Sequence, residues 1–160
     1  MNIFIATFIW TLQLGAASTS TVSACGGDKA QKEMGAHLFK NQEYRQFVCG
    51  EEACTQPEFQ TNLEFREEVL CEKSSTTGCF VEPHRKASNY YSGFFLITGG
   101  KVSPQFVFFG IGLGTTKQSK VKIGCKSVSG RERIDRSTWM DHVFEWDGSS
   151  YVETDSQTRQ

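Results

Sequence analysis

The chain has 160 residues, with 17 basic and 18 acidic side chains and a formal charge of −1 at neutral pH. This near balance argues against a surface for nucleic acid or anionic lipid, because such surfaces need a strong excess of Lys and Arg. The sequence shows no block of like charge and no internal repeat. We therefore expect one domain without a nucleic-acid partner.

Residues 1–24 carry no Asp, Glu, Lys, Arg or His and include an apolar stretch from Ile3 to Ala17. The stretch is shorter than the bilayer span of about 20 predominantly apolar residues. It is typical of a secretory signal peptide, and the small polar residues after it are typical of a cleavage region. The alternative is a buried helix at the start of a cytosolic domain. We predict that residues 1–24 are removed and that 25–160 form a single exported β-rich domain.

The residue after the expected cleavage point is Cys25. The run Val22-Ser23-Ala24-Cys25 is similar to the lipobox of bacterial lipoproteins, in which the cysteine thiol is acylated. Ordinary cleavage after Ala24 gives the same mature N-terminus without lipid. We expect lipidation of Cys25 and a periplasmic protein held at the outer membrane by that lipid, with a soluble secreted protein as the alternative.

In an oxidising compartment cysteines are expected to form disulfides before metal sites. Two pairs lie close in sequence, and we predict that Cys49 bonds to Cys54 and Cys71 to Cys79. Each bridge closes a small loop, which stabilises less than a long one.

The bonding of the two remaining cysteines, Cys25 and Cys125, depends on whether the mature N-terminus is lipidated. A lipidated Cys25 leaves Cys125 unpaired and buried, whereas an unmodified Cys25 is free to bridge to Cys125. Cys79 and His84 are five residues apart, but no second ligand pair accompanies them, so zinc is not expected.

A short amphipathic helix is predicted over 29–39, because Ala30, Met34 and Leu38 recur at four-residue spacing behind a cap at Asp28. The following patterns favour strands. We expect them over 44–49, 63–66 with an extension past a bulge to 69 and 71, 90–98, 105–111, 120–126, 143–146 and 151–153.

The strand at 105–111 is nearly all apolar, as expected of a strand buried on both faces. Residues 147–150, Asp-Gly-Ser-Ser, are a hairpin turn signal, and the polar tail from Thr154 is expected to fray. Several short strands and one helix predict a mainly β fold, namely a small antiparallel sheet, sandwich or barrel with one short N-terminal helix.

Two motifs that often carry chemistry are better explained by strands. The glycines of 110–114 lack the spacing and the following helix of a phosphate loop, so they indicate a bend or a loop. Glu64 and Glu68 face one side of a strand and Glu67 the other, which favours a solvated strand face over acid/base chemistry or calcium binding.

The sequence offers three histidines, His37, His84 and His142, but no strained nucleophile turn. His142 follows Asp141, although neighbours in sequence do not make a catalytic triad. We therefore expect no catalytic residue, no cofactor and no bound metal.

The aromatic segment 90–95, Tyr-Tyr-Ser-Gly-Phe-Phe, is interrupted by a Ser-Gly pair. This interruption indicates either a bulge in a strand or an exposed turn that carries a hydroxyl. We predict Tyr91, Ser92 and Gly93 as partner-binding residues.

Residues 144–152, Phe-Glu-Trp-Asp-Gly-Ser-Ser-Tyr-Val, resemble the ending of many small exported bacterial domains. The glycine-punctuated strands at 105–114, 120–125 and 129–135 are similar to their strand ladder. Cys71 and the Gly78-Cys79 pair before the aromatic strand fit the same arrangement. Some such domains are periplasmic lipoproteins related to lysozyme inhibitors and to immunity proteins that neutralise peptidoglycan hydrolases.

In these inhibitors a Ser-Gly-x-x-Tyr loop enters the cleft of the hydrolase. Ser92 and Gly93 match its first half, but Leu96 stands where the tyrosine is expected. Related domains also carry an acidic calcium loop, whose Asp and Gly pattern is missing at 62–68, so calcium is not expected.

The resemblance implies a non-enzymatic periplasmic or cell-envelope protein that binds a protein partner. That partner is a lysozyme-like or other peptidoglycan hydrolase, which the protein inhibits or to which it gives immunity. The alternative is a structural or accessory envelope lipoprotein without inhibitory activity, and a secreted enzyme comes third.

Overall fold

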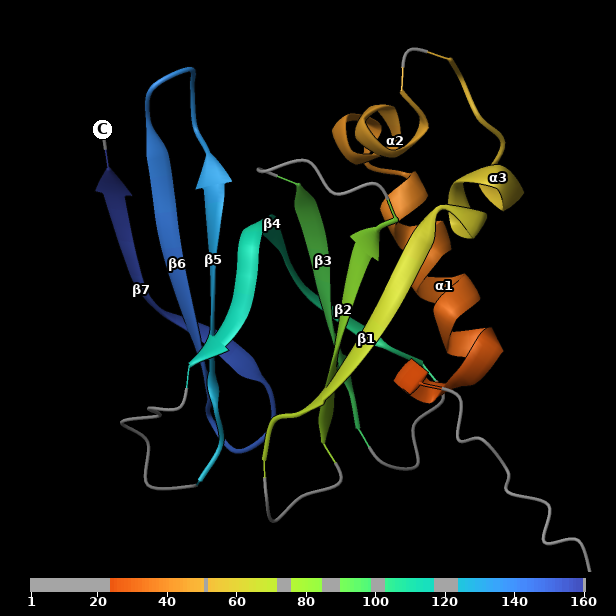
Figure 1. The fold of residues 1–160 in the computed structure, drawn as a ribbon. Helices are drawn as coiled ribbons and strands as arrows, with labels where there is room; N and C mark the ends of the chain where they lie inside the picture. Colours follow the sequence, from red (N-terminus) through yellow and green to blue (C-terminus); the bar gives the residue numbers. More distant parts are fainter. Residues whose placement is uncertain are drawn as a thin grey trace, which may run out of the picture.

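Figure 1 shows the computed structural model, which describes residues 24–50, 52–71, 76–84, 90–98, 103–116 and 124–159. Except for Ala24, the expected signal peptide lies outside the described residues. Seven strands form one open antiparallel sheet, and each pairs with its neighbours in chain order. The strands are β1 (Leu63–Val69), β2 (Thr77–Pro83), β3 (Tyr91–Ile97), β4 (Gln105–Thr116), β5 (Ser127–Arg133), β6 (Trp139–Trp146) and β7 (Tyr151–Arg159). The predicted mainly β fold is confirmed.

The helices lie together on one side of the sheet, beside β1 and β2 in Figure 1. They are the 3-10 turn η1 (Ala24–Gly26) and the helices α1 (Gly27–Phe39), α2 (Gln42–Cys49) and α3 (Gln56–Thr61). The predicted helix at 29–39 is confirmed as part of α1. Two further helices follow it within the described residues.

The strand predicted at 44–49 is wrong, because these residues form α2. The side chain of Asn41 accepts a hydrogen bond of 2.9 Å from the Tyr44 backbone and so caps the start of the helix. Tyr44, Phe47 and Val48 then recur at helical spacing toward the sheet. The local cap outweighs the β preference of the aromatic and branched side chains.

The helices cover one face of the first four strands and bury a core there. Its buried members are Cys25, Ala30, Met34, Leu38, Tyr44, Phe59, Leu63, Cys79, Val81 and Phe95. The hydroxyl of Tyr44 donates to the carbonyl of Val81 at 3.3 Å. This polar contact fixes α2 to the sheet inside an otherwise apolar layer.

A second core lies on the opposite face, because the sheet curls upon itself. A bulge between Ile111 and Gly114 bends β4, and Gly112 adopts a positive φ of 64° there. The end of β1 consequently meets the start of β5, where the backbone N–H of Lys126 donates to the carbonyl of Leu70 at 2.8 Å. The enclosed core consists of Leu70, Cys71, Phe80, Phe94, Leu96, Leu113, Cys125, Val128, Phe144, Trp146 and Tyr151.

The structure changes the predicted disulfides. Cys49 bonds to Cys54 as predicted, but Cys79 bonds to Cys25 and Cys71 to Cys125. The predicted Cys71–Cys79 bridge is wrong, because Cys79 faces the helix-covered core and Cys71 the enclosed core.

The predicted lipidation of Cys25 is contradicted by the same bridges. The sulfur of Cys25 is bonded to Cys79, so it is not available for a thioether to lipid. Cys125 is not free either, and the alternative bridge from Cys25 to Cys125 is also wrong. No local pattern reveals these pairs, because both depend on how the sheet and the N-terminal segment fold back.

Several strand predictions change at their ends. Strand β4 is not buried on both faces, since Gln105 and Phe106 are exposed, and β7 continues to Arg159 where a frayed tail was expected. Of the strand predicted at 120–126, residues 120–123 lie outside the described residues and Cys125 forms only an isolated bridge. Strand β2 was missed, and β5 was anticipated only in the strand ladder at 129–135 that the resemblance implies.

Candidate functional site

The predicted partner-binding residues Tyr91, Ser92 and Gly93 lie in β3, between β2 and β4. Ser92 is 1% exposed and Gly93 is also buried, so the exposed-turn interpretation is contradicted. The Ser-Gly pair is not a bulge either, because Ser92 and Gly93 pair in regular register with Gly110 and Phe109. The register shift with β4 falls after them, between Phe94 and Phe95.

Tyr91 connects the sheet to the helices. Its ring stacks on Phe109 with centroids 4.9 Å apart, and its hydroxyl donates to the carboxylate of Glu43 in α2 at 2.9 Å. Burial, and then the hydrogen bond to Glu43, raise the pKa of Tyr91 to about 12. These three residues therefore build the fold and do not form an exposed binding loop.

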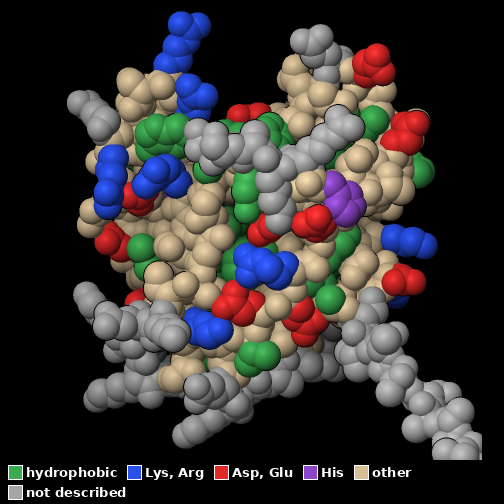
Figure 2. Space-filling view, viewed as in Figure 1, with side chains coloured by type: hydrophobic (Ala, Val, Ile, Leu, Met, Phe, Trp, Pro, Cys, Tyr) green, Lys and Arg blue, Asp and Glu red, His purple; other side chains and the backbone are tan. Residues whose placement is uncertain are grey.

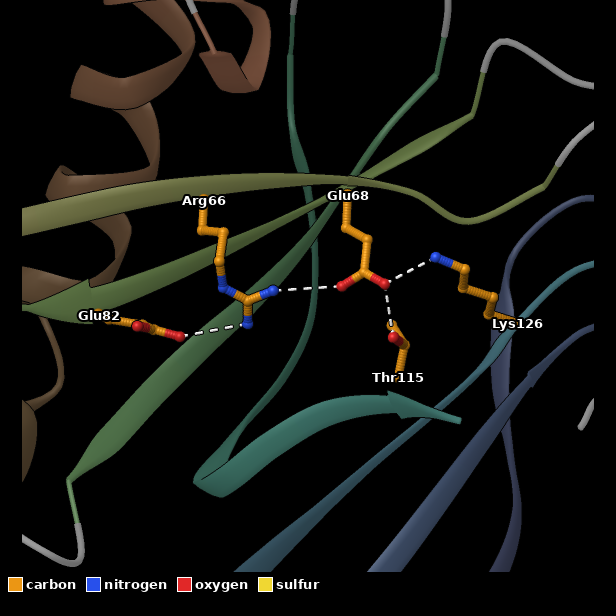
Figure 3. A network of polar contacts seen from close by, with 5 residues as sticks. All are labelled: Arg66, Glu68, Glu82, Thr115 and Lys126. Carbon is orange, nitrogen blue, oxygen red and sulfur yellow. Dashed lines mark hydrogen bonds and ion pairs between the residues drawn. The ribbon is translucent and has the colours of Figure 1, made fainter. Parts of the chain in front are cut away.

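A polar network closes the curl of the sheet next to the Cys71–Cys125 bridge. Glu68 of β1 is its centre, and Figure 3 shows its contacts with Arg66, Thr115 and Lys126. Its carboxylate accepts from the Lys126 ammonium at 2.8 Å, from the Thr115 hydroxyl at 2.5 Å and from Arg66 at 3.2 Å. Arg66 also reaches Glu82 at 3.3 Å. The network thus joins β1 to β2, β4 and the segment before β5.

The charge of Glu68 is matched by its neighbours. Burial alone raises its pKa, but hydrogen bonds from Lys126 and Thr115 and the charges of Lys126 and Arg66 outweigh burial and hold that pKa below its ordinary value. Glu68 thus stays ionised, and its carboxylate links β1 to β4 and to the segment before β5. The predicted solvated face of β1 is in this part a satisfied ion network.

The histidines do not form a catalytic arrangement with a nucleophile among the described residues. His142 is buried and lies 2.8 Å from Glu153 and 3.5 Å from Glu132. His84 pairs with Glu64 at 3.0 Å on the surface, and His37 stacks on Phe106. No cluster of His, Cys, Asp and Glu within the described ranges is arranged to hold a metal ion.

The tip between β5 and β6, residues 131–138, is exposed and held by hydrogen bonds, and we call it the hairpin tip. One oxygen of Asp135 accepts from the backbone N–H groups of Ser137 and Thr138, each at 2.8 Å, and from the Ser137 hydroxyl at 3.2 Å. The backbone N–H of Ile134 donates to the Thr138 carbonyl at 3.0 Å. An aspartate that accepts from the next residues is a stable turn former.

Arg133 holds the other side of the hairpin tip. Its Nε donates to the carbonyl of Asp135 at 2.9 Å and its Nη2 to that of Arg136 at 3.3 Å. Its guanidinium also lies over the ring of Trp139, 5.5 Å from the centroid. The tip is therefore ordered before any partner arrives.

Two side chains at the hairpin tip are directed at solvent rather than at the fold. Ile134 is 51% exposed, and the exposed Arg136 side chain makes no hydrogen bond or ion pair within the part of the chain that the structure describes. Figure 2 shows Lys and Arg side chains gathered at the upper left, over this end of the β5–β7 ribbon. The tip thus combines a free cation with an exposed apolar side chain.

A groove of about 600 Å³ lies below the hairpin tip. On one wall Asp141 of β6 accepts from Arg131 of β5 at 2.7 Å and from Arg159 of β7 at 2.5 Å. These pairs tie the three strands together next to the hairpin tip. Tyr90 and Ile111 line the opposite side.

Sequence reasoning missed the hairpin tip. It assigned 129–135 to a strand ladder and placed the binding residues in β3. An Asp followed two and three residues later by Ser and Thr is a turn signal, and together with the flanking Arg133 and Arg136 it indicates an exposed basic turn. That signal was present at 135–138.

Comparison of the chain with known protein families, with curated proteins and with solved structures found no match. We therefore classify the protein by its fold and its disulfide bonds. Three disulfides indicate an oxidising environment, as in exported proteins. No helix among the described residues has the length and apolar character needed to cross a membrane. The chain is a disulfide-bonded, mainly β protein with an ordered basic hairpin tip.

Proposed function

We propose that this protein is a non-enzymatic domain, exported to the periplasm or beyond, that binds and inhibits a peptidoglycan hydrolase of the lysozyme kind through its hairpin tip. Arg136 is the observation that carries the proposal. It is a free guanidinium on a loop whose backbone is held from both sides by Asp135 and Arg133.

The chemistry of the hairpin tip suits an acidic cleft. Glycosidases act with two carboxyl groups that are about 5 to 9.5 Å apart. A guanidinium binds a carboxylate through paired, charge-assisted hydrogen bonds, so Arg136 can occupy such a site and exclude the substrate. Arg133 adds a second positive charge, and Ile134 adds apolar contact at the rim.

Order in the free loop favours binding. A loop that is already in its bound shape loses little conformational entropy when it enters a cleft. Arginine is also among the residues that most often dominate interface energies. The hairpin tip meets both conditions, whereas in the predicted Tyr91–Gly93 segment Ser92 and Gly93 are buried and Tyr91 is half-buried.

The test is a calorimetric titration of the mature protein against a panel of lysozymes and bacterial peptidoglycan hydrolases, with cell-wall lysis measured in parallel. We expect at least one hydrolase to bind with a Kd of about 1 μM or lower and to lose lytic activity. The Arg136→Glu variant should lose both effects.

Lys40→Glu is the matched control, because it makes the same charge change at an exposed residue that ends α1. It should bind like the wild type. If no hydrolase in the panel forms a complex, the proposal is wrong and the accessory envelope role becomes the better hypothesis.

A further inference from the structure

The start of the described chain is held in an unusual way. Cys25 is 0% exposed and bonded to Cys79, and its backbone N–H donates to the carboxylate of Glu67 in β1. Cys25 is also the only non-glycine residue of the described segments with a positive φ, at 60°. A left-handed backbone is unfavourable for a residue with a Cβ. The peptide bond before Cys25 thus makes the backbone conformation of this buried, cross-linked residue unfavourable.

We propose that the Ala24–Cys25 peptide bond is the processing site of this protein and that the α-ammonium group of Cys25 released there binds the Glu67 carboxylate. In the hydrolysis one water adds across the C–N bond. Ala24 leaves with a new carboxylate, and the nitrogen of Cys25 takes up protons to become an ammonium at neutral pH. Ala24 is a small residue of the kind that export peptidases accept before the cut.

Hydrolysis at this bond improves the fold in two ways. An N-terminal residue has no preceding carbonyl, so the restriction on the φ of Cys25 disappears. The neutral hydrogen bond to Glu67 becomes a charge-assisted one, which is stronger. Removal of the leader also gives up the exposed hydrogen bond of 2.8 Å from the Gln31 side chain to the Ala24 carbonyl. The part-buried ion pair with Glu67 outweighs that loss in this proposal.

The same contacts assign a role to Glu67. Glu67 faces away from Glu64 and Glu68, so it belongs to neither the surface pair with His84 nor the network around Arg66. It is the counterion of the mature N-terminus. With its sulfur in a disulfide and its amine on Glu67, Cys25 carries no acyl group.

The first measurement is the intact mass of the protein exported from its full-length chain. We expect the mass of residues 25–160 with three disulfides and no lipid. A different N-terminal residue, or the added mass of a diacylglyceryl group, would overturn the proposal.

The second measurement separates the ion pair from simple folding. Disulfide-bonded protein is compared in three forms, with a free amine at Cys25, with an acetylated amine at Cys25, and with Ala24 retained. The free amine should raise the melting temperature by about 3 °C over the other two forms. In Glu67→Gln the three forms should melt together.

Glu64→Gln is the matched control, because it removes a carboxylate from the other face of the same strand. It should preserve the difference between the free and the blocked amine. Equal melting temperatures of the three forms in the wild type, or a difference that persists in Glu67→Gln, would overturn the proposed ion pair.

Discussion

The helix-backed strands β1–β4 and the β5–β7 ribbon differ in how much of each strand is buried. Strands β2 and β3 are buried along almost their whole length, whereas Tyr151 is the only buried residue of β7. Figure 1 shows the helices on the side of the sheet away from β5–β7. The helix-backed half supplies most of the core, and the other half presents a charged, ordered tip.

The sequences of the two halves explain the difference. Gly78–Val81 and Gly93–Leu96 are nearly all apolar, while Glu153–Arg159 is polar throughout. The polar strand β7 is held in place by pairing with β6 and by ion pairs such as that of Arg159 with Asp141. It adds little to the core, so its surface is free for recognition.

The bridge that closes the curl should give the largest effect on stability. Cys71 and Cys125 are 54 residues apart, so the double change to alanine should lower the free energy of unfolding by about 4 kcal/mol on the chain-entropy model. Replacing Cys49 and Cys54, five residues apart, should cost about 2 kcal/mol. Urea denaturation checks the order, and a larger loss from the short bridge would contradict it.

The bend of β4, where the two halves meet, should be the next most sensitive place. A Cβ at Gly110 would lie 2.7 Å from the carbonyl oxygen of Arg131, whereas a Cβ at Gly114 would meet nothing within 4 Å. Gly110→Ala should therefore cost about 2 kcal/mol and Gly114→Ala almost nothing. Equal unfolding midpoints for the two variants would show that the bend is not a tight junction.

The order of the hairpin tip should depend on pH. Hydrogen bonds from Ser137 and Thr138 hold the pKa of Asp135 below its ordinary value. A lowered pKa contributes order that is present above the ordinary value of about 3.9 and is lost as the pH falls through the lower value. NMR titration should show the Ser137 and Thr138 amide signals moving below pH 3.9. Movement centred at the ordinary value would contradict these bonds.

The smallest effect on stability is expected at the proposed binding residue. Arg136 is exposed and has no partner in the described part of the chain, so Arg136→Ala should change the free energy of unfolding by less than about 0.5 kcal/mol. Urea denaturation measures it. A loss above about 1 kcal/mol would mean that Arg136 supports the fold and is not held free for a partner.

Local patterns predicted the elements whose structure is decided locally. The aromatic strand β3 and the turn at 147–150 were predicted correctly, and in that turn Asp147 accepts from Ser149 and Ser150 as its sequence indicates. The strand at 63–69 was also predicted, but the bulge expected within it is wrong, because β1 pairs with β2 in unbroken register. Helix α2 was missed because one cap at Asn41 outweighs the β preference of the residues that follow it.

Features that depend on distant residues escaped prediction. The partners of Cys71 and Cys79 follow from the curl of the sheet, and β7 beyond Glu153 exists because β6 pairs with it. The candidate site was placed in β3 because Ser92 and Gly93 suggest a turn, yet pairing on both sides keeps them in a strand. The hairpin tip is a local feature by contrast, and its turn signal at 135–138 was overlooked because 129–135 was assigned to a strand ladder.

Amide hydrogen exchange can locate the binding element of this protein, which we propose is the hairpin tip. Exchange is measured for the free protein and for its complex with a hydrolase from the panel. We predict slower exchange at the amides of 133–138 in the complex, with unchanged rates in α1, α2 and α3. Slower exchange confined to the helices, with the hairpin tip unchanged, would contradict it.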